Sequence, residues 1–305
     1  MQWKGVLPAM TTCFDAGYKV DHAFMARHCR WMVENGCSGI VALGSLGEGA
    51  TLKFEEKVAI LQNCKSALGG TPLVAAISAL STEEAVALAE AAVNAKCDGL
   101  MVLPPYLYQG DWREIKSHMA AVFKATPLSC MLYNNPIAYG TDFTPEHIAE
   151  LAAEHPNFQS VKESSTDTRR VSAIRALLGG RLDILVGVDD GIVEAIGVGA
   201  VGWIAGLANA LPLESVELFT LASQGRRDEA FALYRWFLPL LRLDTVVKFV
   251  QLIKLVETAV DMGNPRVRQP RLELTGEELA DTQRLIADAL KHRPQMTAPL
   301  AGSRS

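Results

Sequence analysis

The sequence predicts an α/β protein, a (β/α)8 TIM barrel with a C-terminal helical extension. Over the first two thirds of the chain, short apolar β-rich runs alternate with longer amphipathic stretches of good helix formers. The apolar runs are nearly continuous, so both faces of each strand are expected to be covered, as in a parallel barrel. The length of 305 residues suits such a barrel as one unit.

Eight runs have the length and composition of strands, and helical patterns separate them. The expected strands are 5–10, 39–43, 73–77, 99–103, 129–133, 158–162, 184–188 and 201–205. The expected helices are 21–35, 54–68, 81–96, 111–125, 144–155, 168–179 and 190–198. Ser81, Asp111 and Thr144 stand before acidic residues or a proline, which is typical of helix starts. This number and order of elements predicts a closed barrel.

After Leu207 the alternation ends and the chain becomes helical. Helices are expected at 212–224, 227–240, 245–260 and 276–291. The connection near 208–212 is short and apolar, so we expect an extension, 208–295, packed on the barrel, 1–207, rather than a free domain. The last residues, 296–305, are expected to form a disordered tail.

The composition excludes several classes of function. The formal charge is -5 and the basic residues are dispersed, which leaves no basic surface for a nucleic acid. No apolar run reaches the ~18 residues that a membrane helix needs, and the N-terminus lacks the apolar core of a signal peptide. We therefore expect a soluble, cytoplasmic protein whose partner is a small molecule.

Two patterns argue against a bound cofactor. The cysteines and histidines form no Cys-x-x-Cys pair and no His/Cys cluster, so no metal site is expected. Residues 197–202 match Gly-x-Gly-x-x-Gly, but they end a helix and enter a strand, whereas a dinucleotide-binding loop leaves a strand and opens a helix. The sequence therefore predicts neither a metal nor a nucleotide cofactor.

Lys162 ends the sixth expected strand, and the C-terminal strand ends of a parallel barrel carry its chemistry. A lysine is nucleophilic only when neutral, and at a pKa of about 10.4 roughly one molecule in 2,500 is neutral at pH 7. Burial can lower this pKa by about 3, which makes the amine available for a Schiff base with a carbonyl substrate. The alternative is a lysine that merely reaches solvent at a strand end.

Two other strand ends carry groups suited to this chemistry. Gly44, Ser45 and Leu46 lie in a loop whose hydroxyl and successive amides suit a carboxylate, although a tight strand-to-helix turn would use the same residues. Tyr133 ends the fifth strand, where its hydroxyl could relay protons to a lysine-bound intermediate or simply bond a backbone group.

The seventh and eighth strands end near Gly187 and Gly206, which we also expect at the substrate. Asp189 and Asp190 follow Gly187, and either carboxylate could bind substrate hydroxyls or cap the next helix. Capping is favoured for at least one of the two, and Asp189 is the expected substrate ligand.

Together, these loops resemble those of the dihydrodipicolinate synthase / N-acetylneuraminate lyase family, a class I aldolase family. The similar segments are 44–48, 133–136, 161–163 and 187–190, and the likeness covers nearly the whole chain. The resemblance implies a TIM barrel, usually a homotetramer, in which a lysine forms a Schiff base with a 2-oxo acid. Carried over, Lys162 is the Schiff-base lysine, Tyr133 the proton relay, and Ser45 with the Leu46 amide the carboxylate-binding group.

Three departures narrow the reaction that the resemblance implies. The synthases of the lysine pathway hold a second carboxylate with an arginine, where this chain has Ala138. They also carry a hydroxyl and a tyrosine where this chain has Leu46 and Leu107. The missing arginine alone could cost about 1.5–3 kcal/mol of binding, which makes 4-hydroxy-tetrahydrodipicolinate synthesis a less favoured activity.

The loops 187–189 and 204–212 resemble those of deaminases that act on 1-pyrroline-4-hydroxy-2-carboxylate in hydroxyproline catabolism. Such a deaminase is the first choice. The alternative is a dehydratase or aldolase of 2-oxo-3-deoxy sugar acids, whose hydroxyls Asp189 and Asp190 would bind. Sialic acid lyases fit poorly, because loop 206–209 lacks their serine. A non-catalytic 2-oxo acid sensor would need neither Lys162 nor Tyr133.

Overall fold

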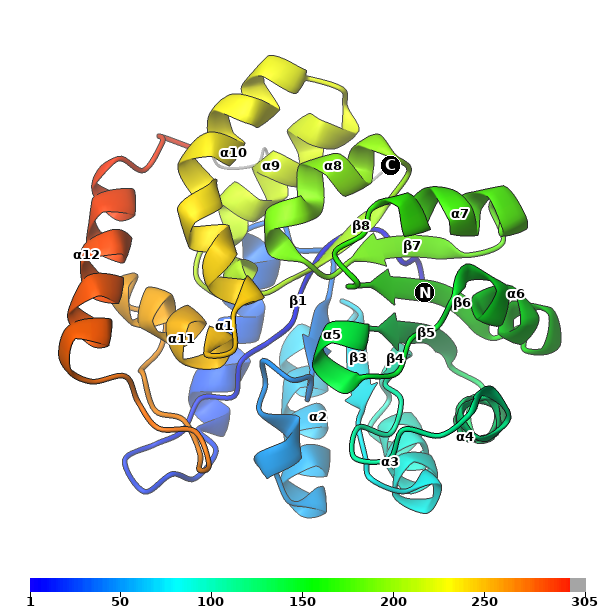
Figure 1. The fold of residues 1–305 in the computed structure, drawn as a ribbon. Helices are drawn as coiled ribbons and strands as arrows, with labels where there is room; N and C mark the ends of the chain where they lie inside the picture. Colours follow the sequence, from blue (N-terminus) through cyan, green and yellow to red (C-terminus); the bar gives the residue numbers. More distant parts are fainter. Residues whose placement is uncertain (297–305) are drawn as a thin grey trace.

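The structure, a computed structural model, describes residues 1–296, and the expected tail lies outside the described residues apart from Met296. Its strands pair in parallel in the order β1-β8-β7-β6-β5-β4-β3-β2 (Figure 1). A bridge between Ala9 and Val41 closes β1 on β2. The bounds are β1 (Gly5–Pro8), β2 (Ile40–Ala42), β3 (Leu73–Ile77), β4 (Gly99–Val102), β5 (Ser129–Asn134), β6 (Phe158–Glu163), β7 (Asp183–Val186) and β8 (Gly202–Ala205). The predicted barrel is confirmed.

Helices surround the strands as an outer layer (Figure 1). They are α1 (His22–Glu34), α2 (Phe54–Leu68), α3 (Thr82–Asn94), α4 (Trp112–Lys124), α6 (Pro145–Glu154), α7 (Arg169–Leu178), α8 (Ile192–Gly197) and α9 (Pro212–Ser223). The side chains of Ser81, Asp111 and Thr144 accept hydrogen bonds from backbone amides three residues on, so these predicted caps are confirmed. A short helix, α5 (Pro136–Tyr139), follows β5, in a segment where no helix was expected from the sequence.

The second strand is shorter than expected. It ends at Ala42, because Leu43 has a φ of 70°, in the left-handed region that a strand does not use. Glu48 is also left-handed, with a φ of 54°. These two turns fold the segment between them back over the barrel mouth, which positions the expected carboxylate-binding loop.

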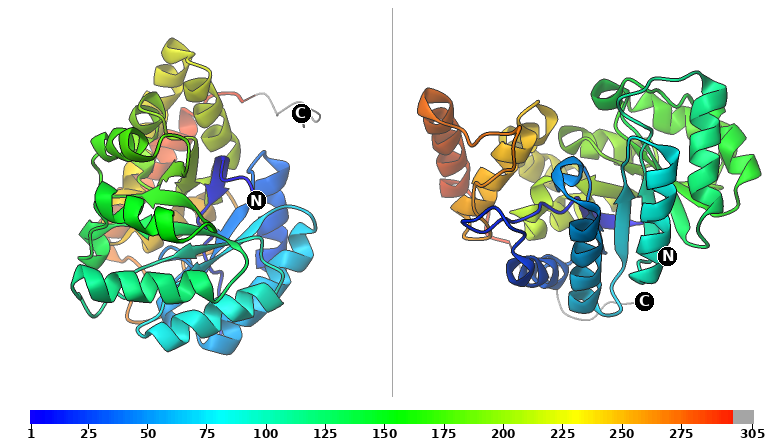
Figure 2. Two further views of the ribbon diagram at one scale, coloured as in Figure 1. Left: turned by 90° about the vertical axis from the view of Figure 1, so that its right-hand side faces the viewer. Right: turned by 90° about the horizontal axis from the view of Figure 1, so that it is seen from below.

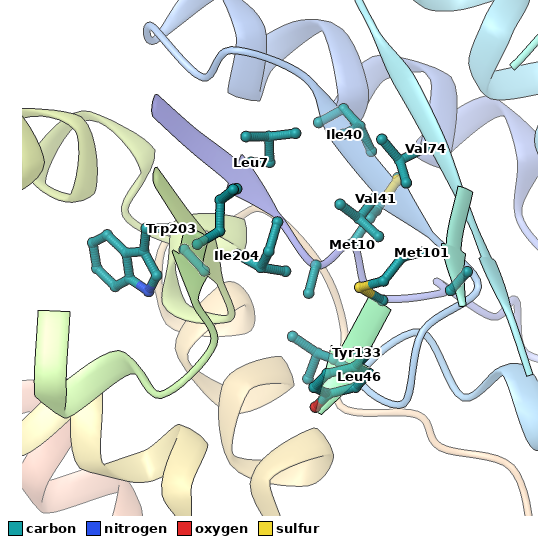
Figure 3. Packing of buried hydrophobic residues seen from close by; sticks show 14 of the residues in the cluster. Leu7, Met10, Ile40, Val41, Leu46, Val74, Met101, Tyr133, Trp203 and Ile204 are labelled. Carbon is teal, nitrogen blue, oxygen red and sulfur yellow. The ribbon is translucent and has the colours of Figure 1, made fainter. Parts of the chain in front are cut away.

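Buried apolar side chains fill the barrel and fix the strand ends. Every residue of β3 is buried, as expected for a strand covered on both faces. Leu7, Val41, Val74 and Ile204 come from four strands and are at most 2% exposed (Figure 3). Because each such side chain contributes about 1.5–3 kcal/mol on burial, the packed interior holds the loops at the strand ends in place.

The C-terminal extension lies on one side of the barrel (Figures 1 and 2). The segment 208–295 that the sequence assigned to this extension begins with α9, which covers the barrel. Beyond α9 it consists of α10 (Arg227–Leu241), the 3-10 turn η4 (Arg242–Thr245), α11 (Phe249–Ala259) and α12 (Gly276–Lys291). The expected helix 245–260 begins only at Phe249, because Val246 is extended. Among the described residues, no helix is long and apolar enough to cross a membrane.

Candidate active site

A cavity of about 550 Å³ opens at the C-terminal ends of the strands. The side chains that line it come from β5, β6, the loops after β2, β7 and β8, and the C-terminal extension. Seven of the expected site residues share this lining: Gly44, Ser45, Leu46, Tyr133, Lys162, Gly187 and Gly206. The structure therefore brings together groups that lie up to 162 positions apart in the sequence.

Lys162 lies inside the barrel mouth and is only 6% exposed. Its side chain crosses the bare Cα of Gly187, where a Cβ would come within 2.1 Å of the lysine Cε. Burial lowers the pKa of Lys162, while Tyr139, Asp244 and Asp189 act in the opposite direction. The amine is therefore nearer to its neutral, nucleophilic form than an exposed lysine would be.

Tyr133 lies beside Lys162 because the two residues are register partners on β5 and β6. Its hydroxyl accepts a hydrogen bond from Asn135 Nδ2 at 3.1 Å, and burial raises its pKa. The ring of Tyr139 packs edge-on against it, with 5.7 Å between centroids and an interplanar angle of 82°. The phenol is therefore held in the cavity, close to the amine that it would serve.

The loop after β2 presents groups suited to an anion. Ser45 Oγ makes a close hydrogen bond with the Tyr139 hydroxyl. The backbone amides of Ser45 and Leu46 find no acceptor within residues 1–296. Successive free amides beside a hydroxyl form a concavity that binds carboxylates. This geometry agrees with the carboxylate-binding role expected from the sequence.

A buried ion pair supports that loop from below. Lys254 Nζ lies 2.6 Å from Glu48 Oε1, and both side chains are at most 1% exposed. Glu48 Oε2 accepts the Arg268 amide, and Lys254 also donates to the Arg266 carbonyl. These contacts join the loop after β2 to α11. The sequence predicted that this part of the chain packs on the barrel, but it did not predict which residues make the contact.

Asp189 and Asp190 were expected either to bind substrate hydroxyls or to cap the next helix, and the structure shows neither arrangement. Neither caps α8, whose N-cap is Gly191. Asp189 lies outside the lining of the cavity, and its carboxylate accepts Trp203 Nε1 and the amides of Gly206 and Leu207. Burial raises its pKa to about 6. Asp189 thus holds the loop after β8 rather than facing the cavity.

Asp190 does not line the cavity that contains Lys162. It lines a neighbouring cavity and lies 3.6 Å from Arg242 Nε. Both aspartates therefore have protein partners, and neither presents a free carboxylate to the cavity that contains Lys162.

Several lining residues were not expected from the sequence, among them Tyr139, Ser164, Asp244 and Arg271. Ser164 Oγ is buried and has no hydrogen-bond partner within residues 1–296. Strand alternation could have found it, because residues two apart share a face and Lys162 precedes it by two. Tyr139 lies in the unexpected helix α5, and the other two belong to the extension, so no local pattern marked them.

Residues 197–202, the segment that matches Gly-x-Gly-x-x-Gly, lie between a helix and a strand. This segment joins the end of α8 to the start of β8, opposite to the order that a dinucleotide loop requires. Within residues 1–296, no group of three or more His, Cys, Asp or Glu side chains is arranged to hold a metal ion.

Known proteins are similar to this chain in sequence and in architecture. Residues 2–289 match the Dihydrodipicolinate synthetase family. A 4-hydroxy-tetrahydrodipicolinate synthase of Agrobacterium fabrum is 31% identical over 291 residues, 95% of this chain and 98% of the relative. The enzyme of the same name from Methanocaldococcus jannaschii is 28% identical over 94% of this chain and 98% of the relative.

The solved structures agree with the sequence match. The 4-hydroxy-tetrahydrodipicolinate synthase of Methylacidiphilum fumariolicum SolV superposes with a TM-score of 0.91 at 25% identity, covering 95% of this chain and 97% of that structure. Members of this family are enzymes that work through a lysine Schiff base, as class I aldolases do. The chain, with Lys162 buried at the mouth of its barrel, belongs to the dihydrodipicolinate synthetase family.

Proposed function

We propose that this enzyme is a deaminase of 1-pyrroline-4-hydroxy-2-carboxylate, acting in hydroxyproline catabolism. The observation that carries the proposal is the buried Lys162 amine, which lies against the Tyr133 ring in a cavity lined by one loop suited to a carboxylate. Ala138, rather than an arginine, stands on the wall beside Tyr139. A substrate with one carboxylate and an electrophilic imine carbon fits this distribution of groups.

In the proposed reaction, Ser45 and the Leu46 amide hold the substrate carboxylate next to Lys162. The lysine amine adds to the ring imine carbon C2, and the ring C2–N bond breaks to leave a lysine Schiff base and a free amine on C5. Tyr133 relays the proton removed from C3. The 4-hydroxyl then leaves as water, and proton transfers shift the new C3–C4 double bond toward C5, which turns the C5 amine into an imine. Hydrolysis at C5 and at C2 releases ammonia, 2-oxoglutarate semialdehyde and the free Lys162 amine. Two waters are consumed and one is released, so one water is consumed overall.

A second candidate is 4-hydroxy-tetrahydrodipicolinate synthesis, the activity named for the relatives. Arg271 favours it, because this residue lines the cavity and forms no ion pair within residues 1–296. Such a cation could hold the second carboxylate that condensation requires. Arg271 belongs to the extension, however, whereas the arginine expected of such synthases follows the tyrosine of the fifth strand, where this chain has Ala138.

A third candidate is a dehydratase or aldolase of 2-oxo-3-deoxy sugar acids. The unpaired Ser164 hydroxyl favours it, because a buried hydroxyl without a partner suits a polyhydroxylated substrate. Lys162 and Tyr133 would serve this reaction in the same roles, so the three candidates differ only in the groups around the shared centre.

The three candidates are separated by their products. The purified protein is incubated with 1-pyrroline-4-hydroxy-2-carboxylate, with pyruvate plus aspartate semialdehyde, and with a series of 2-oxo-3-deoxy sugar acids. We expect 2-oxoglutarate semialdehyde and ammonia from the first at a kcat/KM at least 100-fold above the other two. Efficient condensation, or turnover of a sugar acid without turnover of the pyrroline, would replace the deaminase by the second or third candidate.

We further propose that the enzyme works in the cytoplasm as a homotetramer, as the family resemblance implies. Sedimentation velocity tests the assembly directly. A single species at four times the 33.0 kDa chain mass is expected, and a monomer or a dimer contradicts it.

A further inference from the structure

Asp244 brings a carboxyl group from the C-terminal extension into the cavity that contains Lys162. It lies in η4, and its carboxyl packs against the bare Cα of Gly206, where a Cβ would come within 2.1 Å of Oδ1. Lys162 passes over Gly187 in the same manner at the end of the neighbouring strand. The amine and the carboxyl therefore converge over the ends of β7 and β8.

No structural role accounts for this carboxyl group. Within residues 1–296, the Asp244 carboxyl group makes no hydrogen bond or ion pair, and the nearby Arg242 pairs with Asp190 instead. It does not cap α11, whose N-cap is Lys248. A partly buried carboxyl without a partner is costly, so its retention in the cavity points to a role toward a ligand.

The surroundings also favour the protonated form of this group. Burial raises the pKa of Asp244 well above its usual range, and the nearby carboxylate of Asp189 raises it further. The ammonium form of Lys162 acts in the opposite direction, but that charge is lost while the lysine attacks the substrate. The pKa of Asp244 is therefore shifted toward the protonated form, which is the form that a general acid requires.

We propose that Asp244 is the general acid that protonates the 4-hydroxyl as it leaves the substrate, an inference that rests on the proposed deaminase function. After C3 loses its proton, the enamine electron pair forms the C3–C4 double bond and the C4–O bond breaks. The carboxyl proton moves to the departing oxygen, which leaves as water. The carboxylate then regains a proton from solvent, and no oxidant or reductant takes part.

The test compares the purified full-length enzyme with Asp244→Asn, which keeps the shape of the side chain but removes the acidic proton. Turnover of 1-pyrroline-4-hydroxy-2-carboxylate is expected to fall by about 10²–10⁴-fold, the size of a general-acid effect. Borohydride should still trap pyruvate on Lys162, which shows that the fold and the amine are intact. With the pyrroline, it should trap an adduct that retains the 4-hydroxyl. Asp228→Asn, an exposed acid on α10, is the charge-matched control.

The possible failures are distinct. Turnover by Asp244→Asn within about threefold of wild type overturns the acid role but leaves the deaminase function standing. Equal loss of pyruvate trapping also overturns it, because the residue would then support the site rather than the elimination step. If the wild-type enzyme releases no semialdehyde from the pyrroline, the proposed function fails, and the role of Asp244 fails with it.

Discussion

Lys162 Nζ lies 3.9 Å from the centroid of the Tyr133 ring, and the two residues are register partners on adjacent strands. The parallel pairing of β5 with β6 thus sets the distance between the proposed nucleophile, Lys162, and the proposed proton relay, Tyr133. The ring face attracts the ammonium form, whereas burial disfavours it and lowers the pKa of Lys162 overall. The site therefore orients the amine while leaving it able to lose its proton.

Replacement of Lys162 by alanine is expected to abolish turnover while preserving the fold. The alanine variant cannot form a Schiff base. It loses the packing of the lysine stem, but it also removes the cost of burying an amine, so the fold is expected to persist. Borohydride treatment with pyruvate, followed by mass spectrometry, should show an adduct on the wild type and none on the variant. The exposed Lys291→Ala serves as the control and should retain the adduct. An adduct on the alanine variant would place the Schiff base on another lysine.

Substitution of Tyr133 by phenylalanine is expected to slow turnover by about 10²–10⁴-fold, because it removes one proton-transfer group and little volume. Steady-state kinetics with the preferred substrate measures the effect. Tyr108→Phe is the matched control, because this tyrosine is 59% exposed and lies outside the cavity lining. An unchanged kcat in Tyr133→Phe would remove the relay role.

Tyr139 is expected to act together with Ser45, because their hydroxyls are in direct contact and the Tyr139 ring packs on Tyr133. We expect Tyr139→Phe and Ser45→Ala each to lower kcat/KM by about 10–100-fold, the size of losing one hydrogen bond to a charged group, about 1.5–3 kcal/mol. Groups that work as one unit are not additive, so the double variant should be little worse than either single one. Full additivity in this cycle would mean that the two hydroxyls act independently.

Whether a site residue could be predicted from the sequence depends on whether its contacts are local or distant in the chain. Lys162 and Tyr133 could be placed from sequence, because a strand end is marked by the apolar run before it. Asp189 was expected to bind substrate, but its carboxylate accepts a hydrogen bond from Trp203. This contact depends on the pairing of β7 with β8, which brings residues distant in sequence together. Asp244 and Arg271 belong to an extension whose contacts with the barrel are not local, and no spacing in the sequence reveals them.

Loss of Lys254 is expected to destabilise the protein strongly. Lys254→Met would leave Glu48 as an unpaired buried charge, at a cost of about 3–5 kcal/mol in the free energy of unfolding. Urea unfolding followed by circular dichroism measures this cost. The double variant with Glu48→Gln should recover much of the loss, because it removes the orphaned charge. A single variant as stable as wild type would mean that water reaches the pair.

Glu257 is expected to make the stability of the protein depend on pH between about 4.5 and about 8. Burial raises the pKa of Glu257 from its ordinary 4.5 to about 8, although a hydrogen bond from Thr11 and the charge of Lys254 oppose the shift. The folded protein thus holds a proton that the unfolded chain loses in this interval. Stability is therefore fully present below about pH 4.5 and is lost as the pH rises toward 8.

Glu257→Gln isolates this effect, because the amide keeps the size of the side chain and an oxygen for the Thr11 hydroxyl but does not titrate. Urea unfolding at about pH 5 and at about pH 8 gives the loss of stability for each protein. The loss should be smaller in the variant. His28, whose pKa burial lowers to about 4, contributes equally to both proteins and cancels in the comparison. Equal losses would mean that Glu257 ionises near its ordinary pKa, as it would if water entered this part of the interior.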